Sequence, residues 1–422
     1  MSRHWLNLIG GRAQQKPELV ENWPEVFRHL PVVEMPDVLG RDIPLWREWL
    51  EHPTLDDYWR ELRLDDSFGH IDLPVLHVTG WYDADQPGGL FFYNGMRTKS
   101  GRASDQHVVI GAWDHGGTRV PQQSFAGVDF RASNVLDIQQ LHRDWFDRWL
   151  KDIPDGPPLT GAQLFITGRN TWVTTDSYPP PSGSVRVLHL HSSGGANGLT
   201  GDGRLEGDID ASNERPDRFT YDPNDPVPAA LDENFYSPDA QPTPLDRRFQ
   251  HERDDVLVYT SAAQDSELLL VGQPRVSLFA STDGPDTDWF VALHDVAPDG
   301  TSMMLTEGRL RARFKDGLER ESLLVPEEVH EFQILMGAVG HAVLPGHRIR
   351  LTVTSSDFPI WDRNPNTGAP IGMDTELGIA RNSIFHDAHR PSALILPVAD
   401  ESSLQEHFPV VPEVEAIGSP RD

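Results

Sequence analysis

Two short apolar runs separated by a helical pattern constrain the fold of this chain most strongly, because they predict parallel strands joined by a crossover helix. The runs cover residues 75–78 and 107–110, and a second helix is predicted after them with Ser133 as its N-cap. Strand–helix–strand–helix is typical of α/β domains, in which ligands gather at the carboxyl ends of the strands. The apolar residues of the first helix are Leu90, Phe91, Tyr93 and Met96, and those of the second stand at positions 135, 136, 138, 141, 145, 146, 149 and 150.

The pattern changes from Gly161 onward. Short runs of β-type residues recur with Gly, Pro and Asp turns between them, and long amphipathic helices are almost absent. This spacing predicts an all-β sandwich or jelly roll. The runs are "QLFITG", "VRVLHLH", "DVLVYTS", "PRVSLFAST", "TDWFVALHDV" and "HRIRLTVTSS". The fold class is therefore α/β plus all-β, and the polar stretch from Asp400 is expected to be a surface tail.

The first 70 residues are rich in Trp, Pro and charge. The stretch "IPLWREWLEHPTLDDYWREL" predicts two short helices separated at His52 and Pro53, with Thr54 as the N-cap of the second.

Composition excludes several classes of function. Cysteine is absent, which rules out disulfides, thiol nucleophiles and cysteine-bound metals. The 36 Lys and Arg against 65 Asp and Glu give a net charge of −29, which argues against nucleic acid or an anionic membrane as the main partner. No apolar run approaches the roughly 20 residues of a membrane span, and no export signal is recognisable, so we expect a soluble, cytoplasmic protein.

Ionisable residues follow both strands of the α/β segment. Asp83 comes after the first strand and His115 after the second, 32 positions later, so parallel strands would place both side chains at one edge of the sheet. An Asp and then a His in this chain order form the last two members of an α/β-hydrolase triad, in which the His is the general base and the Asp orients it. Taken singly, an Asp at a strand end is more often a turn or cap residue, and a lone His is usually part of a polar surface.

The third member of a triad is not recognisable. No serine stands in a G-x-S-x-G frame, and the serines before Asp83 are Ser2 and Ser67, the latter in an acidic turn without a preceding strand.

The motifs around the pair resemble the CocE/NonD hydrolases, the group of cocaine-esterase-like enzymes and α-amino-acid ester hydrolases. This group is related through its C-terminal domain to Xaa-Pro dipeptidyl-peptidases. The resemblance covers nearly the whole chain. It is carried by "WLEHPTLDDYWREL", "GWYD…IGAWDHG", "WFDRWLKDIPDG", "LFITGRNTW", "FTYDPNDPVP", "PRVSLFASTDGPDTDWFVALHDVAPDG" and "LPGHRIRLTVTSSDFPIWDRNPNTG".

The resemblance implies three units: a helical cap remnant over residues 1–70, part of an α/β-hydrolase core over 71–158, and a galactose-binding-like jelly roll with a tail over 159–422. Asp83 matches the family's triad aspartate and His115 its triad histidine. The implied activity is hydrolysis of esters or amides through a serine acyl-enzyme, without a metal or organic cofactor. The elbow serine and the tyrosine of the oxyanion hole have no counterpart, so we expect a truncated product or one half of a split enzyme. Such a chain would self-associate or need a partner that carries the serine.

The resemblance also suggests residues for substrate binding. Asp85 matches one of two carboxylates that hold the substrate's α-ammonium in the amino-acid ester hydrolases, whereas the second position is Gln86. We expect Trp81, Tyr82 and Trp113 either to line an acyl pocket or to pack in the core. Similarly, the loop residues Phe358 and Trp361 either reach the pocket or seal a domain interface. His341 and His347 show no metal-ligand spacing and are interpreted as structural.

Two classes of function remain open. The first is a serine hydrolase of small-molecule esters or amides, with α-amino acyl substrates among the possibilities. The second is a non-catalytic binding or assembly module built on the jelly roll, a hypothesis that rests on fold analogy alone.

Overall fold

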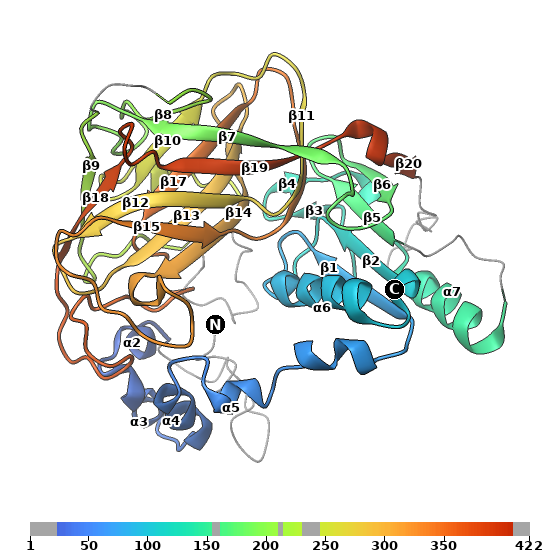
Figure 1. The fold of residues 1–422 in the computed structure, drawn as a ribbon, viewed down its shortest axis with the longest axis horizontal. Helices are drawn as coiled ribbons and strands as arrows, with labels where there is room; N and C mark the ends of the chain where they lie inside the picture. Colours follow the sequence, from blue (N-terminus) through green and yellow to red (C-terminus); the bar gives the residue numbers. More distant parts are fainter. Residues whose placement is uncertain (1–22, 154–160, 210–213, 230–244, 408–422) are drawn as a thin grey trace, which may run out of the picture.

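A computed structural model describes residues 23–153, 161–209, 214–229 and 245–407. Figure 1 shows an α/β unit, a larger β-rich unit beside it, and short N-terminal helices below the β-rich unit. The first 22 residues of the predicted cap and the predicted tail beyond residue 407 lie outside the described residues. No helix of the described part is both long and apolar enough to cross a membrane.

The α/β unit contains a five-stranded sheet in the order β1-β2-β5-β6-β20. Strands β1 (Val75–Gly80), β2 (Gln106–Gly111) and β5 (Gly161–Ile166) are parallel, as their two crossover helices require. Those helices are α6 (Gln86–Lys99) and α7 (Ile138–Lys151). The predicted strands and the helix between them are confirmed, with each element a few residues longer than the apolar run that predicts it.

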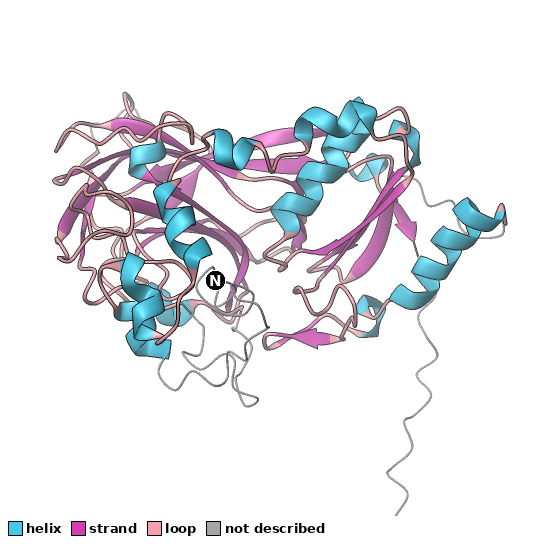
Figure 2. Cartoon of the chain, turned by 90° about the horizontal axis from the view of Figure 1, so that it is seen from below, coloured by secondary structure: helices cyan, strands magenta, loops and turns pink. Residues whose placement is uncertain are grey.

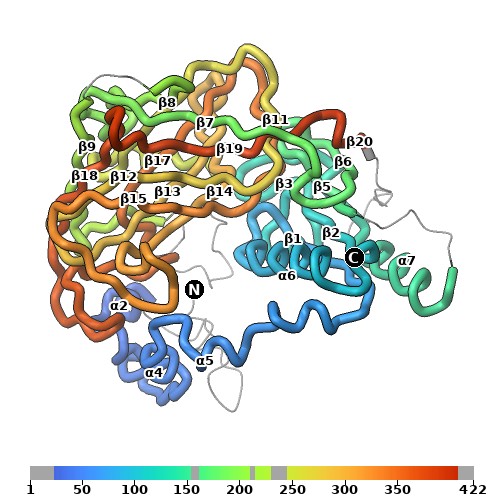
Figure 3. Tube along the Cα trace, in the orientation of Figure 1, coloured from blue at the N-terminus to red at the C-terminus, as the bar shows by residue number. Residues whose placement is uncertain are grey.

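The α/β sheet extends further along the chain than the predicted boundary at residue 158. Strand β5 pairs with β2, and β6 (Thr171–Thr175) continues the same sheet. Strand β20 (Gln405–His407) returns from the end of the β-rich unit to pair with β6, where a surface tail is predicted (Figure 3). Apolar alternation predicts a strand, but only pairing decides which sheet the strand joins.

Two helix starts differ from the predicted ones. Helix α7 is capped by Asp137, whose carboxylate accepts a hydrogen bond from the Gln140 amide at 2.8 Å. Ser133 lies four residues earlier, in a 3-10 turn, and donates to the Asn170 carbonyl instead. Helix α5 (Asp57–Arg60) is capped by Asp56 rather than Thr54. In both places a carboxylate nearer the first turn satisfies the free amides.

Helix α7 also buries less than its sequence predicts. Ile138, Leu141 and Trp145 are buried, but Phe146 and Leu150 are exposed. Figure 2, seen from below, shows α7 at the end of the molecule opposite the N-terminal helices.

The β-rich unit is built around one large apolar core. Its strands pair almost entirely in antiparallel fashion, with β12 at a branch point that contacts β15, β18 and β19. The strands are β7 (Gly183–His191), β8 (Arg204–Glu206), β9 (Asp217–Tyr221), β10 (Leu257–Ser261), β11 (Leu268–Gly272), β12 (Arg275–Thr282), β13 (Asp288–Val296), β14 (Ser302–Arg311), β15 (His330–Leu335), β16 (Val339–Val343), β17 (Arg348–Thr354), β18 (Ala380–Phe385) and β19 (Ala393–Ala399). A single-turn helix, α8 (Arg248–His251), precedes β10.

The N-terminal helices form a small core of their own against the β-rich unit. They are α2 (Trp23–Arg28), α3 (Met35–Val38) and α4 (Pro44–Glu51), and α5 lies beside them, with the Trp59 ring 5.5 Å from that of Trp49. Phe358 of the β-rich unit belongs to this core, and its ring lies 6.4 Å from that of Phe27.

Buried polar contacts join the α/β and β-rich units. The amide side chain of Gln86 donates to the Ala338 carbonyl at 3.0 Å and accepts from the Ala338 amide at 2.8 Å. The Thr167 hydroxyl contacts His341 Nδ1 at 2.7 Å, and Nε2 of the same ring lies 3.0 Å from Asp295. His347 also contacts Asp295, at 2.9 Å. Both histidines therefore pair with one carboxylate near the interface between the units.

Candidate active site

Asp83 lies in the turn that follows β1. Its side chain is 4% exposed, and its Oδ1 accepts a hydrogen bond from the Asp85 amide at 3.0 Å. The Thr79 hydroxyl lies 3.5 Å from the other oxygen. Gly80, the last residue of β1, lies against the backbone of Trp113, where a Cβ atom would lie 2.0 Å from the Trp113 carbonyl oxygen. The Asp83 carboxylate is therefore buried next to the end of β1.

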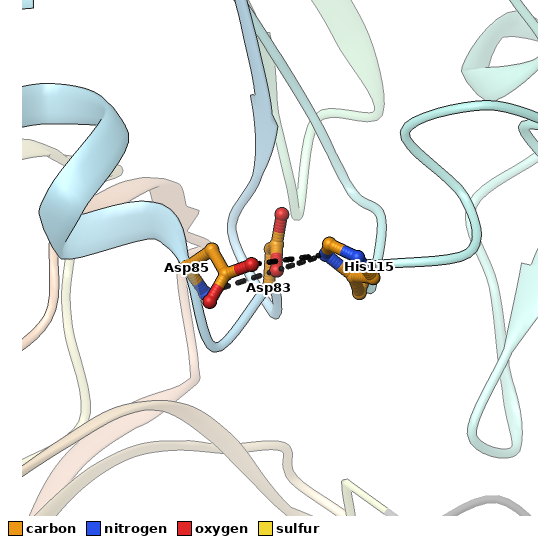
Figure 4. Close-up of side chains that lie close together, drawn as sticks. All are labelled: Asp83, Asp85 and His115. Atoms are coloured by element: carbon orange, nitrogen blue, oxygen red, sulfur yellow. Dashed lines mark hydrogen bonds and ion pairs between the residues drawn. The ribbon is translucent and has the colours of Figure 1, made fainter. Parts of the chain in front are cut away.

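His115 follows β2 and faces this carboxylate (Figure 4). Its Nδ1 lies 3.2 Å from Asp83 Oδ1, as the spacing of the two strand ends predicts. The side chain of His115 is 55% exposed, and its Nε2 is within 3.4 Å of Arg119 Nη2. An imidazole oriented through Nδ1 by a buried carboxylate presents Nε2 as the atom available for proton transfer.

No serine hydroxyl of the described residues forms a hydrogen bond with His115. Ser67, one of the two serines before Asp83, belongs to the 3-10 helix Asp65–His70. Ser2 lies outside the described residues. The described part of the chain therefore holds the Asp83–His115 pair without a serine hydroxyl in hydrogen-bond contact with His115.

Asp85 is the second carboxylate beside the imidazole. Its Oδ2 lies 3.4 Å from His115 Nδ1, and its side chain is 77% exposed (Figure 4). Ligand atoms of Asp83, Asp85 and His115 all lie within 4.8 Å of one another, so these three could hold a metal ion. The nitrogen that faces both carboxylates is Nδ1. A metal bound there would take the place of the proton that hydrogen-bonds to Asp83, so metal binding competes with the base arrangement.

Three aromatic residues predicted near the pair have different environments. Trp81 is 6% exposed and donates from Nε1 to the Phe165 carbonyl at 2.7 Å. Trp113 is 1% exposed and donates to the Asn134 carbonyl at 3.0 Å. These two indoles pack in the core, because a buried indole must find an acceptor and both find one in the interior. Their burial supports the packing alternative for both, and the pocket alternative stays a prediction.

Tyr82 is the aromatic residue of this group that keeps partial exposure. Its ring lies between Phe125, in the short strand β3 (Ser124–Phe125), and Phe130, which follows β4 (Val128–Asp129). Burial, with the negative charge of Asp295, raises the pKa of its hydroxyl well above the ordinary value. The hydroxyl of Tyr82 is therefore neutral at ordinary pH.

Phe358 and Trp361 lie away from the Asp83–His115 pair. Phe358 is 4% exposed and packs in the core that it shares with the N-terminal helices, which supports the interface alternative. Trp361 is half-buried, and the Arg309 guanidinium lies 3.0 Å from the centre of its ring.

Gln86 and Asn134 position the site without a recognisable sequence signal. Gln86 Nε2 donates to the Trp81 carbonyl in the turn beside Asp83, at 3.2 Å, while the other contacts of this amide reach Ala338. Asn134 accepts from the Ala112 amide at 3.1 Å and so fixes the chain that leads from β2 to His115. The sequence around Gln86 and Asn134 contains no motif that marks either residue. Their partners Ala338 and Ala112 are distant along the chain.

An Asp–His pair at the carboxyl ends of neighbouring parallel strands, beside a β-rich unit, defines the class of α/β hydrolases with an additional C-terminal domain. Comparison with protein families identifies the family within this class. Residues 12–117 match the X-Pro dipeptidyl-peptidase (S15) family, and residues 156–395 match the X-Pro dipeptidyl-peptidase C-terminal non-catalytic domain. The chain belongs to this family of hydrolases, of the CocE/NonD type.

Individual relatives agree with the family. Cocaine esterase from Rhodococcus sp. is 33% identical over 411 residues, which cover 93% of this chain and 69% of the esterase. An aminopeptidase from a Thaumarchaeota archaeon has a TM-score of 0.80 at 28% identity, covering 90% of this chain and 64% of its own. An α-amino acid ester hydrolase shares the fold with a TM-score of 0.80 at 23% identity. The chain thus spans slightly less than two thirds of the aminopeptidase, and slightly more of the esterase.

Proposed function

We propose that this chain provides the base of a serine hydrolase that cleaves small-molecule esters or amides. His115 takes the proton of a serine hydroxyl through Nε2, and Asp83 fixes the tautomer and stabilises the imidazolium that forms. The observation that carries the proposal is the 3.2 Å contact between His115 Nδ1 and the buried Asp83 carboxylate. A relative that is 33% identical to this chain is a cocaine esterase, which supports ester hydrolysis as the reaction class.

The serine hydroxyl, in this proposal, comes from polypeptide outside the described residues. The free edge of β1 supports this idea, because within the described residues β1 pairs with β2 alone. Its first four residues are only half-buried, whereas β2 is buried throughout. Parallel strands are normally buried within a sheet, and an unpaired strand edge offers free backbone groups for pairing. A further strand therefore fits beside the free edge of β1. Self-association and a partner chain are both compatible with it.

Two finer features belong to the same proposal. The β-rich unit is inferred to be a jelly roll, which its antiparallel pairing around a single core supports. The substrate is inferred to be a small molecule rather than nucleic acid or membrane, since a net charge of −29 repels phosphate-bearing partners. No organic cofactor or metal is required by the proposed chemistry.

Labelling with a fluorophosphonate probe tests the nucleophile. The tagged chain is purified from the cells that produce it and treated with the probe, and the labelled serine is mapped by mass spectrometry. We expect one labelled serine, either in a co-purifying polypeptide or outside the described residues of this chain, because only a base-activated hydroxyl reacts rapidly. The matched control is His142→Ala, which changes an exposed histidine of α7. Absence of labelling in the wild-type preparation would leave the binding-module hypothesis in its place.

Asp85 is proposed to hold the α-ammonium group of an α-amino acyl substrate. Its carboxylate is largely exposed beside the base, where it can form a charge-assisted hydrogen bond. We expect Asp85→Asn to lower kcat/KM of the unlabelled assembly that contains the probe-reactive serine about tenfold or more for an α-amino ester, but less than about threefold for its desamino analogue. Hydrolysis of the two esters is compared side by side. An equal loss on both would show that Asp85 acts through His115 instead of through the substrate.

A further inference from the structure

Two carboxylates face the same ring nitrogen of His115, although one is enough to orient a catalytic base. Asp83 Oδ1 lies 3.2 Å from His115 Nδ1, and Asp85 Oδ2 lies 3.4 Å from the same atom (Figure 4). A neutral imidazole has at most one proton to donate from Nδ1. The Asp85 carboxylate is therefore not needed to orient the ring.

The separations between these atoms match those of a tetrahedral zinc site. At zinc bond lengths of about 2.0–2.2 Å, neighbouring ligand atoms of a tetrahedron lie about 3.3–3.6 Å apart. His115 Nδ1 lies at 3.2 Å and 3.4 Å from the two carboxylates, and ligand atoms of all three residues lie within 4.8 Å of one another. The Asp85 and His115 side chains are 77% and 55% exposed, so water can reach the fourth position.

The ligand atom of Asp83 is held in place before any ion binds. Its Oδ1 accepts a hydrogen bond from the Asp85 amide at 3.0 Å, and the Thr79 hydroxyl lies 3.5 Å from its other oxygen. Such hydrogen bonds to a ligating carboxylate fix its orientation and raise metal affinity. The nearest cation, Arg119, contacts His115 Nε2 at 3.4 Å, on the opposite side of the ring from both carboxylates.

We propose that Asp83, Asp85 and His115 bind Zn²⁺, and that the bound ion switches off the base. The imidazole nitrogen favours zinc over Mg²⁺ and Ca²⁺, which prefer oxygen ligands. Zinc takes the lone pair of Nδ1, so the single proton of the neutral ring moves to Nε2. A protonated Nε2 cannot accept the proton of a serine hydroxyl. The inhibition rests on the proposed function, whereas zinc binding does not.

Isothermal titration of the full chain with zinc chloride, after treatment with a chelator and its removal, tests binding directly. We expect one site with a Kd of about 10 µM or tighter. Asp85→Asn keeps the size of an exposed side chain but removes its charge, and should weaken binding about tenfold or more. His115→Ala should remove the site. The chain has 18 histidines, so His142→Ala, at an exposed position of α7, is the matched control and should bind zinc as the wild type does.

Cobalt(II) reports the geometry of the site, because it accepts the same ligands as zinc and absorbs visible light. We expect wild-type chain with Co²⁺ to show the intense visible absorption of a tetrahedral complex, which zinc abolishes and an equal concentration of Mg²⁺ does not. The absorption should be absent from His115→Ala. A weak octahedral spectrum that persists in His115→Ala would contradict the assignment.

The inhibition is measured on the unlabelled assembly that contains the probe-reactive serine. Zinc should abolish hydrolysis of a desamino ester, and EDTA should restore it. Relative to its own rate without zinc, Asp85→Asn should need about tenfold more zinc for the same inhibition.

Two results would overturn the proposal. Zinc binding is refuted if zinc at about 1 mM does not bind the wild-type chain, or if Asp85→Asn and His115→Ala both bind it as tightly as the wild type does. Inhibition is refuted if zinc binds and hydrolysis continues unchanged. Because zinc binding is measured without any hydrolysis, its failure is distinguishable from failure of the proposed hydrolase.

Discussion

Replacing His115 with alanine is expected to lower hydrolysis by the unlabelled assembly that contains the probe-reactive serine by at least about 10⁴-fold in kcat/KM, with substrate binding little changed. The reason is that, in the proposed mechanism, His115 Nε2 removes the serine proton, while Asp83 contacts only Nδ1. Asp83→Asn should cause a comparable loss, because an amide stabilises the wrong tautomer of the imidazole. Initial rates on an activated ester, together with fluorophosphonate labelling, measure both effects.

The effects of the two substitutions should not add. Residues that act as one unit lose most of their rate with the first substitution, so the double variant should be close to His115→Ala alone. His142→Ala serves again as the exposed control. Hydrolysis that persists within tenfold in His115→Ala would contradict the assignment of His115 as the base.

Replacing Trp81 with alanine is expected to lower the free energy of unfolding of the α/β unit by about 3–5 kcal/mol. The indole is buried, its Nε1 hydrogen bond to the Phe165 carbonyl is lost, and its ring fills the space above Gly340. A Cβ on Gly340 would lie 2.3 Å from this ring, so the two units are in direct contact there. Chemical denaturation monitored by circular dichroism gives the change in stability.

A graded comparison separates packing from substrate binding. Trp81→Phe keeps most of the apolar volume but not the hydrogen bond, and should therefore cost clearly less than Trp81→Ala. Trp59→Ala, at a half-buried position among the N-terminal helices, should also cost less. If Trp81→Ala left stability within about 1 kcal/mol of wild type and instead raised KM, the indole would be a pocket residue after all.

The strands and the Asp–His pair could be predicted because they depend on local patterns. Apolar runs locate β1 and β2, and a 32-residue spacing suits one crossover helix, so the two strand ends must meet at one edge. The caps of α5 and α7 were predicted less well. Several residues near each helix start can act as a cap, and the local backbone selects Asp56 and Asp137.

The aromatic residues show where local patterns stop being informative. Trp81, Trp113 and Phe358 follow strands just as pocket residues would, yet all three are buried. An exposed pocket wall and a domain interface need the same apolar side chains, so sequence leaves these alternatives open. Packing of the β-rich unit against the α/β sheet and of the N-terminal helices against the β-rich unit decides between them.

The sequence by itself determined the classes of strand and helix, the absence of cysteine chemistry, and the pairing of Asp83 with His115, since each depends on residue type and short-range spacing. Only the tertiary structure decided that β5, β6 and β20 belong to the α/β sheet and that Gln86 joins the two units. It alone revealed that Nε and Nη1 of Arg247 are buried without a hydrogen-bond partner among the residues that the structure describes. These features depend on contacts between residues far apart in the chain, and such contacts leave no local pattern to read.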